Sequence, residues 1–151
     1  MIILVIALLG VPTYLLVKRR TSPGRIDWSI LNDSEFAQLK PYLIAQAKVE
    51  SADFQSEIFK KYNNAFGMGC PRKRPTTQTG CSEPNYDGGR RVGIYSSPNE
   101  SLRDQILWLR YTRFPKEVYS TEEFAEQMKK RSYFQTDTLT YIKALESWLL
   151  Q

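Results

Sequence analysis

The chain has 151 residues, which allows one ordinary domain with a short appendage and enough length to bury a core. Its 21 basic residues against 16 acidic ones give a net charge of +5, which favours anionic surroundings such as nucleic acid, membrane headgroups or cell-wall polymers. It contains no histidine, which excludes a Ser-His-Asp triad, a Cys-His pair and the usual zinc sites, so acid–base chemistry has to come from carboxylates, tyrosines or lysines.

An apolar segment opens the chain, with an uncharged run at positions 2–17 followed by Lys18, Arg19 and Arg20. At roughly 1.5 Å per residue this run spans about 24 Å, slightly less than a hydrocarbon core of about 30 Å. A secretory signal has its basic residues before the apolar run and a cleavage site of small residues after it, and this segment has neither. The pattern predicts a single-span membrane anchor over residues 1–20, with a buried N-terminal helix as the alternative.

Residues 21–33 contain a Pro-Gly pair and are predicted to form a linker. The segment 33–62 is predicted to hold two helices, with Pro41 near the start of the second, and then a short third helix. The Asn-Asn-Ala-Phe-Gly sequence at 63–67 ends that helix, because Asn and Gly readily take unusual backbone angles.

Residues 70–95 are rich in Pro, Gly, Thr and Asn, and they carry a hairpin signal with Asp87-Gly88 or Gly88-Gly89 at the turn. Helical periodicity then resumes over three segments, 99–111, 121–130 and 137–151. The predicted fold class is α+β and mainly helical, with one small β-hairpin lobe inserted between helices.

Three stretches of the sequence stand out, "AQAKVESADFQSEIFKKYNNAFGM", "YSSPNESLRDQILWL" and "KKRSYFQTDTLTYIKAL". They resemble a known enzyme family, the peptidoglycan glucosaminidases of glycoside hydrolase family 73, the flagellar and autolysin type. Members read A-x-x-E-S, a spaced Ser and N-N-x-F-G, then Tyr-x-Ser, S-x-x-D and an aromatic before the last helix. The resemblance covers about residues 34–147. It implies a lysozyme-like catalytic domain over residues 34–151, preceded here by the transmembrane anchor and linker.

The resemblance implies an endo-β-N-acetylglucosaminidase that cleaves peptidoglycan glycan strands without a cofactor or metal, and it places the general acid at Glu50. Glycoside cleavage needs a proton delivered to the leaving oxygen, so this acid has to be neutral at the working pH. Glu50 follows the apolar run 43–49, and partial burial would raise its pKa. A solvated helix residue is the alternative interpretation of this glutamate taken alone.

The second catalytic group is expected in the β-lobe, where the candidates are Glu83 and Asp87. A solvated turn residue is the alternative for each. The substrate's own N-acetyl group or its 6-hydroxyl could replace a second carboxylate, and the 6-hydroxyl would make the enzyme a lytic transglycosylase. Those enzymes often show Gly-Leu-Met-Gln after the Glu-Ser pair, and this chain does not, so hydrolysis ranks higher.

A non-enzymatic, membrane-tethered wall-binding or structural protein is a further alternative, against which the intact Glu50 argues.

The resemblance also names four side chains of the substrate groove, Asn63, Asn64, Tyr95 and Tyr133. The two asparagines are expected to fix the loop and help shape the cleft, and a plain turn is their alternative. Each tyrosine either lines the sugar groove or serves as ordinary packing.

Cys70 and Cys81 are expected to form a disulfide, because they are an even pair in a chain whose implied substrate lies outside the cytoplasm. They flank the basic loop at 72–74, which is either solvated or contacts anionic wall groups. No recognition motif supports nucleic acid as a partner.

The location of the domain has two interpretations. The implied substrate places it outside the cytoplasm, on a bacterial inner-membrane anchor facing the wall. The basic residues directly after the apolar run would instead keep it in the cytoplasm, which suits a phage enzyme stored there and built into a virion. Its partners would then include the virion membrane or capsid proteins.

Overall fold

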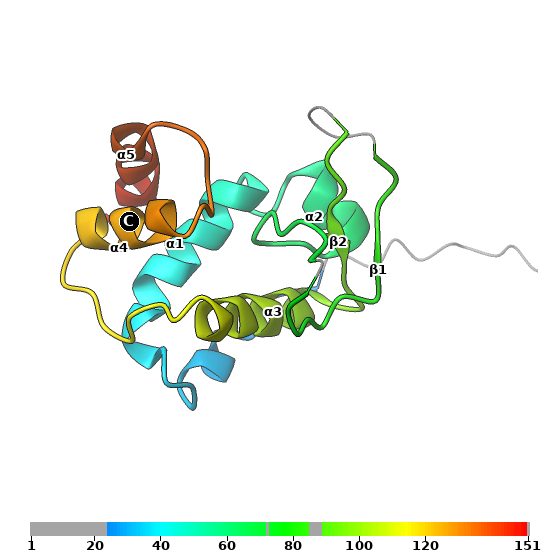
Figure 1. Ribbon diagram of the computed structural model, residues 1–151, viewed down its shortest axis with the longest axis horizontal. Helices are drawn as coiled ribbons and strands as arrows, with labels where there is room; N and C mark the ends of the chain where they lie inside the picture. The colour runs from blue at the N-terminus through cyan, green and yellow to red at the C-terminus, as the bar shows by residue number, and fades with distance from the viewer. Residues whose placement is uncertain (1–23, 72, 85–88, 151) are drawn as a thin grey trace, which may run out of the picture.

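The computed structural model describes residues 24–71, 73–84 and 89–150. These form five α-helices, two 3-10 helices and two short strands (Figure 1). The helices are α1 Lys40–Ser51, α2 Glu57–Tyr62, α3 Pro98–Tyr111, α4 Thr121–Lys130 and α5 Thr138–Leu149, and the strands are β1 Gly80–Cys81 and β2 Gly93–Ile94. The predicted mainly helical architecture with a small β-lobe between helices is confirmed.

The predicted anchor at residues 1–20 lies outside the described residues. Within the described part of the chain, none of the helices is both long and apolar enough to cross a membrane.

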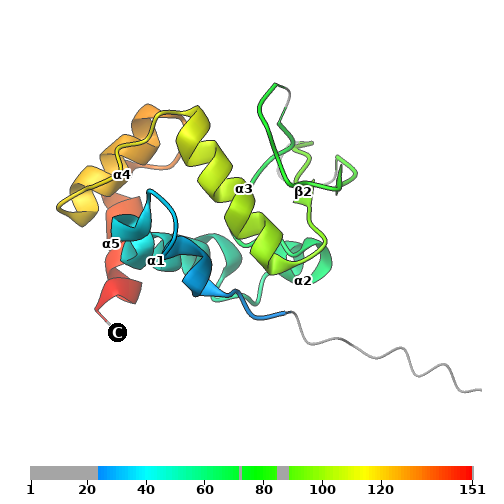
Figure 2. The ribbon, with the colours of Figure 1, turned by 90° about the horizontal axis from the view of Figure 1, so that it is seen from below.

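Helices α1 and α3 run between two groups of elements, as Figures 1 and 2 both show. Helices α4 and α5 lie on one side, where α5 packs against both α1 and α4. Helix α2 and the two strands lie on the other side. The core between them is formed by buried apolar side chains from every helix, among them Leu43, Phe59, Leu102, Phe124 and Leu145.

The structure of the segment before α1 differs from the prediction, which was a linker at residues 21–33 followed by a helix. Residues 28–31 and 37–39 form 3-10 helices, and α1 begins at Lys40 with Pro41 in its first turn, as predicted. Ile26 and Leu31 are buried in the core. Residues 24–33 therefore belong to the folded domain, because the burial of apolar side chains such as Ile26 and Leu31 stabilises the folded state.

The β-lobe is an antiparallel pair in which Gly80 lies opposite Ile94 and Cys81 opposite Gly93. Gly69 bridges Val92 on the other side of the second strand. The disulfide between Cys70 and Cys81, with Cα atoms 6.0 Å apart, confirms the predicted bridge and ties the outer segments together. Among the predicted turn residues, 87 and 88 lie outside the described residues.

Candidate active site

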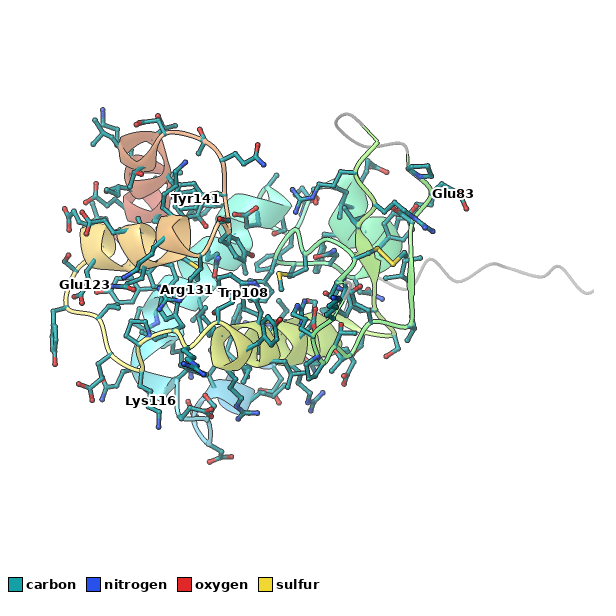
Figure 3. All side chains as sticks on the ribbon, viewed as in Figure 1. Glu83, Trp108, Lys116, Glu123, Arg131 and Tyr141 are labelled. Atoms are coloured by element: carbon teal, nitrogen blue, oxygen red, sulfur yellow. A yellow bond between two sulfur atoms is a disulfide. The ribbon has the colours of Figure 1, made fainter. Side chains whose placement is uncertain are left out.

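A cleft of about 810 Å³ separates the helical side from the β-lobe. Its walls are formed by the end of α1, by the loop that follows α2, and by side chains of helices α3 and α5. The lining residues are Val49, Glu50, 66–71, Arg74, Arg90, Trp108, 132–136 and Tyr141. In Figure 3, Trp108 and Tyr141 mark the α3 and α5 sides of this region.

Glu50 occupies the last turn of α1 and lines this cleft. The helix ends directly after it because Ala52 takes a left-handed conformation, and the Ser51 hydroxyl accepts a hydrogen bond from the Phe54 N–H at 2.8 Å. The Tyr141 hydroxyl donates to Glu50 Oε1 at 3.1 Å.

Burial raises the pKa of Glu50 to about 7, although the hydrogen bond from Tyr141 and the positive charge of Arg90 partly oppose the rise. A carboxyl group with this pKa is protonated through the acidic range and about half protonated near pH 7. Glu50 can therefore donate a proton inside the cleft and accept one afterwards, which is the chemistry that a general acid needs.

Gly67 lies directly against the Glu50 carboxyl group. Its φ is +60°, and a Cβ at this position would lie 3.0 Å from Glu50 Oε2. Both observations favour glycine here, because a left-handed conformation costs an L-residue about 1 kcal/mol or more and because the carboxyl group would have to move to make room for a Cβ.

Gly67→Ala is accordingly expected to lower activity more than stability. The added methyl group displaces the acid, whereas the backbone strain costs about 1–2 kcal/mol of unfolding free energy. The measurement compares the cleavage rate of peptidoglycan with the urea midpoint of the same protein. An activity loss no larger than that of Gly89→Ala would contradict a close-contact role, since Gly89 also has a positive φ but no atom within 4 Å of its Cβ position.

The two predicted asparagines hold the loop that carries Gly67. Asn63 ends α2 at φ +55° and donates to the Tyr95 carbonyl at 3.0 Å. Asn64 is fully buried, donates to the carbonyls of Met68 and Gly93, and accepts from the Met68 N–H. These hydrogen bonds fix the loop, whereas the predicted contribution of the two asparagines to substrate binding stays a prediction. Neither side chain is among those lining the cleft, so they shape it from behind.

The two predicted tyrosines have different positions. Tyr133 lines the cleft, donates its hydroxyl to the Phe66 carbonyl, and packs edge-on to Trp108 with ring centroids 5.0 Å apart. Tyr95 is only 2% exposed, and its hydroxyl donates to Asp104 at 2.7 Å. The structure thus brings Tyr133 to the Glu50 cleft and places Tyr95 in the core, as packing.

Of the two candidates for a second carboxylate, Glu83 is the one that the structure describes, and it is not brought to Glu50. Glu83 is exposed at the outer edge of the β-lobe, across the molecule from Tyr141 (Figure 3), and does not line the cleft. Asp87 lies outside the described residues. Among the described residues that line the cleft, Glu50 carries the sole carboxylate.

Sequence reasoning missed Tyr141, Phe134 and Arg90 as cleft residues. The rings of Phe134 and Tyr141 stack with centroids 3.9 Å apart, which fixes the tyrosine beside Glu50. A weak signal existed for Tyr141, since it lies four residues before the buried Leu145 on one face of α5. Nothing local marked Arg90.

Arg74, from the predicted basic loop, turns inward. Its guanidinium donates to both oxygens of the fully buried Asp104 carboxylate, at 2.7 and 2.8 Å. The same carboxylate accepts from Tyr95 and from Gln78. Burial alone would raise the pKa of Asp104, but the hydrogen bonds from Arg74 and Tyr95 outweigh it and lower the pKa. This cluster joins the β-lobe to α3.

Comparison with known proteins gives a match over most of the chain. The family described as "Glucosaminidase: Mannosyl-glycoprotein endo-beta-N-acetylglucosaminidase" matches residues 33–151. No curated protein matches significantly.

Two solved structures share the fold. One is a type VI secretion system effector-immunity complex from Pseudomonas protegens, with a TM-score of 0.60, 18% identity, and 82% of this chain and 89% of that chain covered. The other is a C-terminally truncated glycoside hydrolase domain from Salmonella typhimurium FlgJ, with a TM-score of 0.52, 20% identity and the same coverage of 82% and 89%. At these identities they show similarity of fold alone.

Proposed function

Because the chain belongs to the glucosaminidase family, whose characteristic sequence it matches over residues 33–151, we propose that it is an endo-β-N-acetylglucosaminidase cleaving the glycan strands of bacterial peptidoglycan. The observation that carries this proposal is Glu50, a carboxyl group of raised pKa that lines the large cleft. A non-enzymatic wall-binding protein has no need of such a group.

In the first step, protonated Glu50 donates its proton to the glycosidic oxygen as the bond from this oxygen to the anomeric carbon breaks. The Glu50 carboxylate that remains then takes a proton from the attacking water. A pKa near 7 serves both steps, because the acid is protonated before cleavage and can still act as a base afterwards.

Among the described residues that line the cleft, Glu50 is the one carboxylate, and we propose that the substrate itself takes the second role. In this scheme the carbonyl oxygen of the sugar's own N-acetyl group attacks the anomeric carbon as the leaving group departs, and water later opens the ring so formed. The same observation favours a second candidate function, lytic transglycosylation. There the 6-hydroxyl attacks the anomeric carbon, Glu50 takes the hydroxyl proton, and no water is consumed.

The products distinguish these functions. Purified sacculi are digested, and the fragments are separated and weighed before and after reduction of their sugar ends. A glucosaminidase leaves fragments that end in reducible N-acetylglucosamine, whereas a transglycosylase leaves muramyl ends that are lighter by one water and cannot be reduced. Intact sacculi after exhaustive treatment would contradict both enzymatic functions.

Tyr141→Phe is expected to move the alkaline limit of activity to higher pH. The Tyr141 hydroxyl stabilises the charged form of Glu50, so its removal raises the pKa of the acid, while the phenylalanine ring can keep the stacking on Phe134. The measurement is the pH dependence of kcat/KM on solubilised glycan strands. An unchanged profile would show that the hydrogen bond does not control the acid.

We propose further that residues 1–20 anchor the enzyme to a membrane. Two placements follow: a bacterial inner membrane with the domain facing the wall, or a phage virion membrane, with capsid proteins as possible neighbours. The basic residues Lys18, Arg19 and Arg20 support cytoplasmic storage of the domain before virion assembly. Protease treatment of intact spheroplasts that express the full chain tests this: digestion of the domain indicates the wall-facing topology, and protection until lysis indicates storage.

A further inference from the structure

Arg90 lies beside Glu50 at the cleft without being part of its hydrogen bonding. It lines the cleft and donates from Nη2 to the Gly67 carbonyl at 3.0 Å. Gly67 is also the residue whose Cβ position lies 3.0 Å from Glu50 Oε2. The guanidinium and the acid are therefore both in contact with a single residue.

Within the described residues, no ion pair with a carboxylate neutralises the charge of Arg90. The other arginine that lines the cleft, Arg74, is neutralised by the buried Asp104. None of the ion pairs between described residues involves Arg90, and its side chain is exposed. Its guanidinium has five N–H donors, and one bond to a carbonyl leaves most of them available to a ligand.

We propose that Arg90 binds a carboxylate of the glycan strand close to the scissile bond, so that the cleft selects acidic peptidoglycan over neutral N-acetylglucosamine polymers. A planar guanidinium that is already fixed by one hydrogen bond is suited to a carboxylate, which it can meet with two parallel N–H groups. The carboxylate belongs either to the lactyl group of the muramyl sugar or to its stem peptide. This inference rests on the proposed function, because it names a feature of the same substrate.

The test measures binding, in a Glu50→Gln background that does not cleave the ligand and removes the titration of the acid. The ligands are peptide-free glycan strands with free lactyl carboxylates, and the same strands after amidation of those carboxylates. The proteins are E50Q, E50Q/R90Q and E50Q/R91Q. Arg91 is the matched control, because it is the neighbouring exposed arginine, does not line the cleft and donates instead to the Ser82 carbonyl at 2.9 Å.

Amidation is expected to weaken binding to E50Q and E50Q/R91Q by about five- to tenfold, as for a charge-assisted pair that is partly exposed to solvent. In E50Q/R90Q the effect of amidation should fall below about twofold, because no guanidinium remains to sense the charge. Peptide-bearing strands provide the second arm. An Arg90 effect confined to them assigns the carboxylate to the stem peptide, and an effect on the peptide-free strands assigns it to the lactyl group.

The two proposals fail in different ways. Binding of all strands by E50Q without any effect of amidation, on either kind of strand, would overturn the role of Arg90 and leave the proposed function standing. An R91Q effect equal to that of R90Q would also overturn it, by showing a general charge effect. Failure of folded E50Q to bind any strand would contradict the proposed function itself. The amidation arm on E50Q needs no change at Arg90, so the absence of any amidation effect there overturns the proposal even if R90Q destabilises the loop.

Discussion

Glu50→Gln is expected to lower the rate of glycan cleavage by about a thousandfold, within the range that positioned general acids contribute. Glutamine keeps the size of the side chain and can still accept the hydrogen bond from Tyr141, but it has no proton to transfer. The measurement is the release of reducing or anhydro ends from purified sacculi at pH 5–6, where Glu50 is protonated.

Glu83→Gln is the matched control, because this acid is exposed on the outer edge of the β-lobe (Figure 3). Its activity is expected to equal that of the wild type. A Glu50→Gln protein that keeps activity within a few fold would contradict the assignment of the acid, and a large loss in Glu83→Gln would restore that residue as a second catalytic carboxylate.

The same substitution has an expected effect on stability that depends on pH. The pKa of Glu50 is about 7 in the folded protein against 4.5 ordinarily, so the folded state holds a proton that the unfolded state releases between these values. Since the native state binds more protons there, the unfolding free energy falls as the pH rises through this window. Glu50→Gln should therefore be more stable than wild type at pH 8, by up to about 3 kcal/mol, with little difference at pH 4. Urea unfolding at both pH values measures it.

Asp104→Ala is expected to destabilise the domain by about 3–5 kcal/mol, the usual cost of removing one partner of a buried ion pair. The side chain of Asp104 is 0% exposed and that of Arg74 is 8% exposed, so the substitution leaves a nearly buried guanidinium without its counter-charge. The Tyr95 hydroxyl and the Gln78 amide lose an acceptor as well. Urea or thermal unfolding at neutral pH measures the change.

Glu35→Ala supplies the comparison, because Glu35 forms a two-point ion pair with Arg110 at the surface. Their side chains are 29% and 50% exposed, so water replaces the lost partner and the expected cost is below about 1 kcal/mol. Equal losses in the two variants would show that burial of the Arg74–Asp104 pair has no special weight in this fold.

Much of the local structure follows from short-range sequence signals. Apolar periodicity placed the helices, Pro41 marked the start of α1, and the asparagines at 63–64 marked the end of α2. The serines of the motif around Glu50 form local hydrogen bonds in the structure. Ser51 accepts the Phe54 N–H and Ser56 caps α2, so the motif is one acid set in a frame of hydrogen-bonded turns.

The rest of the site was decided by contacts between distant parts of the chain. Tyr141 meets Glu50 only because α5 packs on α1. Tyr95 belongs to the family motif, yet it turns into the core because the buried Asp104 accepts its hydroxyl. Arg74 and Arg90 lie in one basic, Pro- and Gly-rich region. The carboxylate of Asp104 on α3 lies against Arg74 and neutralises it.

By itself, the sequence determined where most of the helices lie and which cysteines pair, and it singled out Glu50 as the proposed acid, because these depend on local periodicity, on a single possible partner or on motif spacing. Only the tertiary structure decided what surrounds that acid. Burial sets the pKa of Glu50, and burial is a property of all the segments that pack around a group. Three further features arise in the same way, from packing that brings distant segments together or holds them apart: Tyr133 at the cleft, Arg90 at its rim and Glu83 exposed on the outer edge of the β-lobe.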